Sequence, residues 1–443
     1  MSEIIQDRYI ANLAAMIRKE TVSENGSTDL TKFREFHALL KELFPHIFAA
    51  ADFEDMDGSF LMRWKGTDPQ ALPVLFMNHH DTVEAKGDWH HDPFGAEIYD
   101  KKLWGRGTLD TKGGLWAMLQ AADDLAAEGF VPETDIYFES SCNEETTNLG
   151  ALHIAEVLKE RGIRFSFVLD EGGMVLYEPF SGAKADFAMI GMAERGCSNL
   201  LFTAKGDGGH ASVPEKNTPL VRLGQFMAEA DKNRIFKVHV NHVIKEMLRR
   251  MAPTVKGPLG FIYAHPGFFA PLLTFVMPRV SPTARALVQT TVAFTMAEGS
   301  DGYNVIPAKA SVVGNMRVSH HQGWESSLKA ISDLAKKYDL ETTVLEKAED
   351  STLADFHDPA FHLMEQAVKA AFPKAITAPY IMTGCSDARY MNPLTQNCLH
   401  FTPFFIDERQ MESIHGLDEC VDLSTLKPAV EFYRYLMKGA KHG

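Results

Sequence analysis

The pattern of apolar and polar positions predicts alternating helices and buried strands over the first 190 residues. A period of about 3.6 residues indicates a helix, whereas a short continuous apolar run indicates a strand that is buried on both faces. The predicted helices cover residues 4–19, 31–43, 112–128 and 149–161, and the predicted strands cover residues 72–78, 134–141 and 165–169. Strands separated by helices predict an α/β fold, with a mostly parallel central sheet flanked by helices.

A different pattern begins near Glu194 and predicts a smaller α+β unit. Strand-like runs cover residues 199–205, 287–294 and 308–317, and helical periodicity covers residues 218–231 and 324–338. The first kind of alternation resumes after about residue 347, with helices at 359–372 and 425–438. We therefore expect a discontinuous larger domain, residues 1–194 and 348–443, into which a smaller domain, residues 195–347, is inserted.

Length and charge narrow the classes of function. The chain has 443 residues, and a single core stops growing at roughly 250–300 residues, so two or more domains are expected. The net charge of −15 argues against nucleic acid or an anionic membrane as the main partner, because phosphate binding draws on clustered Lys and Arg. The five cysteines include no Cys-x-x-Cys pair, so neither a disulfide framework nor a cysteine zinc site is expected.

The sequence contains no pattern typical of export or membrane insertion. Its first 20 residues form an amphipathic pattern with early acidic residues and lack the apolar core of a signal peptide. The most apolar stretch, residues 257–278, is interrupted by prolines and glycines, which does not suit a membrane-spanning helix of about 20 apolar residues. We therefore expect a cytoplasmic protein without a membrane partner.

Candidate metal ligands begin at the end of the first predicted strand. His79 and Asp81 follow the apolar run at 72–78, and in extended backbone two side chains at this spacing point to the same side. One of the two side chains can then bind a metal while the other holds the imidazole in its orientation. Asp110 lies between glycines just before the helix at 112–128, where it could equally be a helix N-cap.

Further carboxylates follow the other two predicted strands. Glu144 and Glu145 come after the strand at 134–141, and Asp170 directly follows the strand at 165–169. Adjacent glutamates are commonly a solvated acidic face, but here they follow apolar residues and have no basic neighbour in sequence. Proteins with parallel sheets bind their ligands beyond the carboxyl ends of the strands. With His415 far downstream, this mixed set of nitrogen and oxygen donors suits zinc, cobalt or manganese.

The order of these motifs resembles the co-catalytic zinc metallopeptidase family that includes aminoacylase, glutamate carboxypeptidase, acetylornithine deacetylase and carboxypeptidase S. The segments that add to the resemblance are WHHDPF at 89–94, GDGGHAS at 206–212, NVIP at 304–307 and GCSDAR at 384–389. The DEGG sequence at 170–173 and the apolar insert look closest to the carboxypeptidase S and N-acyl-amino-acid hydrolase branch. Asn143 and Cys385 depart from the usual residues of the family, but neither departure removes a ligand.

The resemblance implies two Zn²⁺ ions per subunit, with Co²⁺ or Mn²⁺ as alternatives. The metal ligands that it implies are His79, Asp110, Glu145, Asp170 and His415. Asp110 would bridge both ions, and its peptide bond to Thr111 would be cis. Glu171 is an alternative to Asp170, because some branches of the family place this ligand one residue later.

The resemblance also implies catalytic roles for residues beside the metals. Glu144 would be the general base, and Asp81 would orient His79. Neighbouring side chains at a strand end diverge, so Glu144 and Glu145 can hardly bind the same ion. We therefore expect one glutamate to bind the metal and the other to remain free to accept a proton from water.

The inserted domain would act as a lid and dimerisation domain. In the family, the equivalent of His210 comes from the partner subunit and holds the oxyanion, although alone it could be an exposed loop residue. Arg317, which alone could be a surface charge, would bind a substrate carboxylate together with Asn304. We therefore expect a homodimeric hydrolase that cleaves an amide bond in a small peptide or an N-acyl amino acid. The alternatives are a dipeptidase of the same family and a catalytically silent relative.

Overall fold

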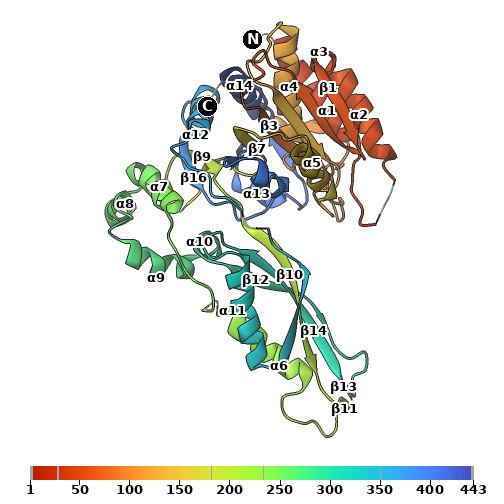
Figure 1. The fold of residues 1–443 in the computed structure, drawn as a ribbon, viewed down its shortest axis with the longest axis vertical. Helices are drawn as coiled ribbons and strands as arrows, with labels where there is room; N and C mark the ends of the chain where they lie inside the picture. The colour runs from red at the N-terminus through yellow and green to blue at the C-terminus, as the bar shows by residue number, and fades with distance from the viewer. Residues whose placement is uncertain (1–2, 27–28, 181, 233, 350, 441–443) are drawn as a thin grey trace.

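A ten-stranded sheet and a separate four-stranded sheet organise the structure, a computed structural model that describes residues 3–26, 29–180, 182–232, 234–349 and 351–440 (Figure 1). The α-helices are α1 (Glu3–Arg18), α2 (Thr31–Leu43), α3 (Pro45–Ala50), α4 (Lys112–Ala127), α5 (Leu149–Glu160), α6 (Pro219–Asp231), α7 (His242–Met251), α8 (Gly257–Ala264), α9 (Ala270–Val280), α10 (Pro282–Val288), α11 (Trp324–Lys337), α12 (Pro359–Ala371), α13 (Glu408–Ser413) and α14 (Leu423–Gly439). Two short 3-10 helices are η1 (Ala252–Thr254) and η2 (Asp387–Leu394).

The large sheet has the strand order β1-β2-β6-β3-β7-β17-β9-β8-β18, and β16 pairs with β9. Its strands are β1 (Ala51–Met56), β2 (Ser59–Trp64), β3 (Val74–His79), β6 (Ile136–Ser141), β7 (Phe167–Asp170), β8 (Val175–Tyr177), β9 (Asp186–Gly191), β16 (Ile376–Tyr380), β17 (Cys398–His400) and β18 (Phe405–Ile406). The central strands β6, β3, β7 and β17 are parallel, which confirms the predicted α/β fold. His79 pairs with Ser141, so β3 and β6 end at the same edge.

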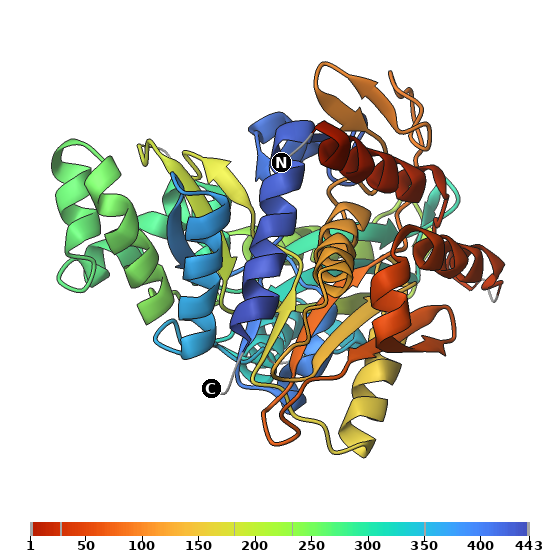
Figure 2. The ribbon, with the colours of Figure 1, turned by 90° about the horizontal axis from the view of Figure 1, so that it is seen from above.

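Alternating side chains of the central strands serve two cores. Val74 and Phe76 face the larger core, whereas Leu75 and Met77 face a smaller core beneath α5 and η2. A strand buried on both faces has no polar side, which is why β3 has a continuous apolar run in the sequence. Figure 2 shows α12, α14 and α4 side by side across one face of this sheet.

The small sheet is antiparallel, with the order β12-β14-β10-β15, and its core contains apolar residues of α6 and α11. Its strands are β12 (Thr291–Glu298), β14 (Lys309–Val318), β10 (Gly196–Lys205) and β15 (Leu340–Glu346). The two-stranded pair of β11 (Gly209–His210) and β13 (Val305–Ile306) lies at the tip of this sheet, farthest from the large sheet (Figure 1). A three-stranded sheet joins β4 (Glu97–Tyr99), β5 (Lys102–Trp104) and β19 (Cys420–Asp422).

The segment between α6 and β12 differs from the sequence prediction. Residues 242–288 form α7 to α10, and the strand expected to start at residue 287 starts at Thr291, because the preceding residues complete α10. Val243 and Met247 of α7 are buried in the core of the large sheet, and α7 packs against β16. This part of the insert therefore packs on the larger core rather than on the small sheet. Within the described ranges, no helix combines the length and apolarity needed to cross a membrane.

Candidate metal centre

The imidazoles of His79 and His415 lie at opposite oxygens of the Asp110 carboxylate. His79 ends β3, Asp110 comes two residues before α4, and His415 comes two residues after α13. His79 Nε2 lies 3.0 Å from Asp110 Oδ1, and His415 Nε2 lies 2.9 Å from Asp110 Oδ2. The Asp110–Thr111 peptide bond is cis, as the resemblance implies. A carboxylate with one imidazole at each oxygen is suited to bridging two metal ions.

Two further glutamates complete the donor set on either side of Asp110. Glu145 Oε1 lies 3.1 Å from His415 Nε2, and Glu171 Oε1 lies 3.4 Å from His79 Nε2. Ligand atoms within 4.8 Å of one another form two groups in the described residues: His79, Asp110 and Glu145, and His79, Glu144 and Glu171. These nitrogen and oxygen donors, without cysteine, suit a divalent zinc, cobalt or manganese ion.

Asp170 and Glu171 face different surroundings at the end of β7. Asp170 Oδ2 accepts hydrogen bonds from Ser386 Oγ at 2.8 Å and from the Ala388 backbone N–H at 2.9 Å. Glu171 is the residue whose carboxylate lies beside His79. The prediction that Asp170 is the fifth ligand does not match this geometry, which favours Glu171. The physical reason is that consecutive side chains at a strand end point to opposite sides.

Asp81 joins the loop of His79 to the loop of the two glutamates. Its two carboxylate oxygens accept hydrogen bonds of 3.1 Å from the backbone N–H groups of Glu144 and Glu145, and the side chain is fully buried. The Nδ1 of His79 lies 3.0 Å from the Asp81 backbone oxygen and 3.3 Å from its Oδ1. A proton on Nδ1 directed at Asp81 leaves the Nε2 lone pair free to face a metal ion.

The crowding of acidic groups shifts their pKa values strongly. Burial raises the pKa of Glu171 to about 8, and the nearby negative charge of Asp110 adds to this effect. Burial likewise raises the pKa of Glu144 well above its usual range. Hydrogen bonds to Asp110 and Glu145 raise the pKa of His415 to about 10. A nearby divalent cation favours the ionised form of such buried carboxylates, so the donor set fits a metal centre.

A buried ion pair, neither member of which was predicted as a site residue, supports the loop that carries Asp110. Arg106 Nη1 lies 2.7 Å from Glu419 Oε2, and both side chains are buried. Glu419 also accepts hydrogen bonds from the backbone N–H groups of Leu109 and Asp110. No spacing rule connects residues this far apart in sequence, so only the folded chain reveals their pairing.

The residues predicted to face the substrate lie in two places, one at the two-stranded pair of β11 and β13 and the other on β14 of the small sheet. His210 is exposed on β11, next to Asn304, whose backbone oxygen accepts a 2.9 Å hydrogen bond from the Ala211 N–H. Both lie at the tip far from the large sheet (Figure 1). Arg317 lies near the opposite end of β14, with Nη1 2.9 Å from the Sγ of Cys385. One chain therefore does not bring His210 or Asn304 to its own metal ligands.

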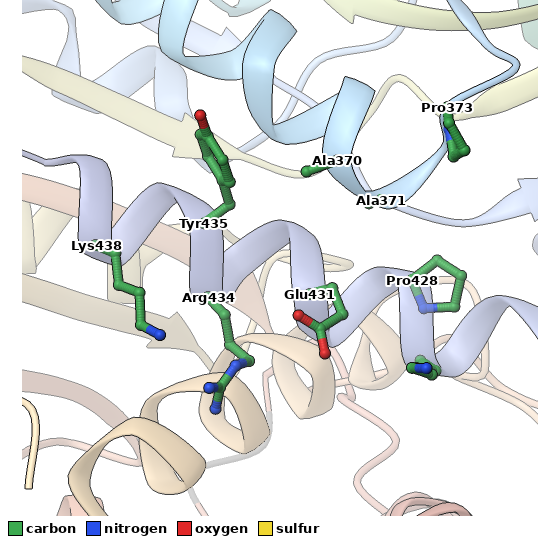
Figure 3. Close-up of a pocket in the computed structure, with 9 residues that line it drawn as sticks. Ala370, Ala371, Pro373, Pro428, Glu431, Arg434, Tyr435 and Lys438 are labelled. Atoms are coloured by element: carbon green, nitrogen blue, oxygen red, sulfur yellow. The ribbon is translucent and has the colours of Figure 1, made fainter. Parts of the chain in front are cut away.

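Two surface cavities differ in whether members of this cluster line them. A cavity of about 650 Å³ is lined by Glu145 and His415, together with residues such as Lys86. A second cavity of about 580 Å³ is lined by residues of α14 and of the end of α12. In Figure 3 Tyr435 points from α14 toward α12, whereas Arg434 and Lys438 point to the other side. None of the predicted site residues lines the second cavity. Of these two cavities, the first is the one that candidate metal ligands line.

Comparison with known proteins finds relatives over most of the chain. Residues 75–439 match the model of Peptidase family M20/M25/M40. The Dictyostelium discoideum protein named Probable carboxypeptidase S-like 2 is 30% identical over 421 residues, which cover 93% of this chain and 80% of that protein. The human N-fatty-acyl-amino acid synthase/hydrolase PM20D1 is 28% identical over 425 residues, which cover 94% of this chain and 84% of that protein.

A solved structure shows the same fold. The M20 family metallo-carboxypeptidase of Sulfolobus solfataricus has a TM-score of 0.73 to this chain at 15% identity, with 99% of each chain covered. This similarity supports the fold, and the family match over most of the chain supports the class of enzyme. The chain is a metal-dependent hydrolase of peptidase family M20.

Proposed function

We propose that this enzyme hydrolyses an amide bond in a small substrate with a free carboxylate, using two divalent cations, zinc in the first instance. The observation that carries the proposal is the placement of His79 and His415 at opposite oxygens of Asp110. Asp110 would bridge the cations, with His79 and Glu171 on one and Glu145 and His415 on the other. The bound cations would polarise the amide carbonyl and lower the pKa of water.

Glu144 is the proposed general base. Its backbone is fixed by the hydrogen bond to Asp81, and its carboxylate belongs to the donor group around His79 and Glu171. With Glu171 and Glu145 assigned to metal, Glu144 remains free to take a proton from water and to pass it to the leaving amine. Divalent charge nearby would keep Glu144 ionised before the reaction, despite its burial.

The substrate class follows from the relatives and from one cationic side chain. The relatives are named as a probable carboxypeptidase S-like protein and as an N-fatty-acyl-amino acid synthase/hydrolase. A peptide C-terminus and an N-acyl amino acid both carry a free carboxylate. Arg317 is the proposed carboxylate binder, since a guanidinium can hold a carboxylate through two hydrogen bonds. His210 and Asn304 would reach a centre only from a second subunit, which supports a homodimer as the active form.

Hydrolysis of a matched substrate panel tests this function. The panel contains N-acyl amino acids, the same compounds with the carboxylate converted to an amide, and free dipeptides. We expect turnover of the N-acyl amino acids, loss of turnover after amidation, loss after chelation and recovery with Zn²⁺ or Co²⁺. Turnover of free dipeptides alone would favour the dipeptidase alternative. An enzyme with a full metal complement and no turnover of any compound would contradict the proposal.

A further inference from the structure

Helices α8 and α9 and the loop between them expose a set of large apolar side chains. Phe261, Phe268 and Phe275 are 60%, 83% and 62% exposed. We call this set the apolar ridge, and its members are Leu259, Phe261, Phe268, Leu272, Phe275 and Val280, all of them exposed. All six lie within residues 259–280, and large exposed apolar patches normally mark interaction surfaces.

The opposite side of the same helices is anchored in the protein core. On α9, Leu273 and Met277 are buried, whereas Leu272 and Phe275 point outward. Phe269 packs against the core, and its ring centroid lies 5.0 Å from that of the exposed Phe268. The exposed residues are therefore held in place by an ordered helical hairpin. Figure 1 shows α7, α8 and α9 projecting to one side of both sheets.

A basic cavity of about 370 Å³ adjoins the apolar ridge. Four cationic side chains line it, and no carboxylate does: Lys232, Arg234, Arg279 and Arg285. Lys232 also forms an ion pair with Glu229 at 2.6 Å. From the first to the last residue lining the cavity, residues 232–289, the sequence has nine basic residues and one acidic residue. This local excess of positive charge stands in a chain whose net charge is −15.

The ridge and the cavity share helix α9. The guanidinium of Arg279 lies 4.1 Å from the centroid of the Phe275 ring, one helical turn away. We propose that the apolar ridge and the basic cavity together form a docking surface for an anionic phospholipid bilayer. Aromatic and aliphatic side chains would enter the boundary between headgroups and acyl chains, and the cations would meet lipid phosphates. This inference does not depend on the proposed hydrolysis.

The charge of the surface favours a bilayer over two other occupants. A symmetric contact between two copies through this surface would bring its cations together, which is unfavourable. A soluble phosphate would engage the cavity but would leave the phenylalanines exposed. A bilayer would cover the apolar ridge and would also bring lipid phosphates to the cations of the basic cavity. We expected no membrane partner from the net charge of the whole chain. This segment is instead basic and apolar, so the net charge does not describe it.

Vesicle flotation with the full chain tests the proposal. We expect binding to phosphatidylcholine vesicles that contain phosphatidylglycerol, weaker binding to pure phosphatidylcholine, and release at high salt. Combined Arg234→Glu and Arg279→Glu substitutions should reduce binding by ~10-fold or more, since each basic residue near an anionic surface adds to the attraction. The matched control is Lys329→Glu with Lys336→Glu, two lysines on α11 that are each 76% exposed.

Phe261→Ser with Phe268→Ser and Phe275→Ser should also abolish flotation, whereas Leu149→Ser with Tyr177→Ser, at two exposed residues away from the ridge, should not. Thermal unfolding checks that each variant is folded. The proposal is overturned if the folded wild-type protein does not float, or if the ridge variant floats as well as wild type. It is also overturned if inorganic phosphate binds while vesicles do not, or if the ridge variant only dissociates an oligomer.

Discussion

The buried carboxylate of Glu419 accepts a 2.7 Å hydrogen bond from the backbone N–H of Leu109, the residue before Asp110. The same carboxylate pairs with Arg106, and it lies four residues after His415. One side chain therefore connects the loops of two proposed metal ligands that are distant in sequence. Such outer partners determine ligand position and metal affinity.

Glu419→Gln should weaken both folding and metal binding. The substitution leaves the Arg106 guanidinium buried without its charge partner, which costs about 3–5 kcal/mol of unfolding free energy. Gln has one accepting oxygen where Glu419 has two, so the backbone N–H groups of the loop before Asp110 lose part of their acceptor capacity, and we expect a ~10–100-fold loss of metal affinity. Denaturant unfolding and metal titration measure the two effects. Glu412→Gln, at an exposed glutamate of α13, is the control, and equal behaviour of the two variants would contradict this role.

Glu171→Gln and Asp170→Asn should have different consequences. The first removes a proposed ligand beside His79, so the variant should bind fewer metal ions per chain while remaining folded. The second weakens the hydrogen bonds that Asp170 accepts from Ser386 and Ala388, so it should lower thermal stability more than metal content. Elemental analysis and thermal unfolding separate these outcomes. Loss of metal in Asp170→Asn alone would reverse the assignment.

Glu144→Gln should retain metal and lose turnover. A general base contributes typically ~10²–10⁴-fold to a rate, so kcat should fall by about that factor. The neighbouring Glu145→Gln should lose metal as well, because Glu145 is a proposed ligand. Metal content and kcat measured on the two variants test the division of roles between adjacent glutamates. Retained turnover in metal-loaded Glu144→Gln is the result that this assignment does not allow.

Metal removal should lower thermal stability. Asp110, Glu144, Glu145 and Glu171 crowd one buried site, and a divalent cation offsets their repulsion. A cation that binds only the folded state stabilises that state by mass action. Calorimetry should show a lower Tm after chelation and recovery with added Zn²⁺ in a concentration-dependent manner. An unchanged Tm in protein confirmed to have lost its metal would argue against a site at this cluster.

His37 should make stability depend on pH below neutrality. Its side chain is 3% exposed and packs against Phe53 and Phe60, and burial lowers its pKa to about 4. Between pH 6.5 and 4 the unfolded chain binds a proton that the folded chain does not, so the unfolding free energy falls as the pH falls through this window. His37→Phe should reduce this fall by about 2–3 kcal/mol at pH 4. If the unfolding free energies of variant and wild type fell equally with pH across this range, this role of His37 would be contradicted.

The sequence was most informative about buried parallel strands and the acids that follow them. Continuous apolar runs predicted β3, β6 and β7, and their common direction brings His79 and Glu145 to one edge. The choice between Asp170 and Glu171 could not be made in this way, because it depends on the residue at which β7 ends. Similarly, the pairing of Glu419 with Arg106 exists only through tertiary contact.

Other features were missed for local reasons. The β1–β2 hairpin, which was not predicted, turns at Asp57 and Gly58, both with positive φ. An Asp-Gly pair is a strong hairpin signal in a sequence. In the stretch 257–278, prolines suggested interruption, yet Pro258 and Pro271 lie in the first turns of α8 and α9, where proline is tolerated. The exposure of Phe261 and Phe275 reflects tertiary packing, which periodicity alone does not determine.

Anomalous diffraction from crystals of the zinc-loaded enzyme tests the central claim most directly. We predict two zinc peaks about 3.5–4 Å apart, on either side of the Asp110 carboxylate. One should contact His79 and Glu171, and the other should contact Glu145 and His415. A single peak, a peak bound by Asp170 in place of Glu171, or zinc located away from Asp110 would contradict the account.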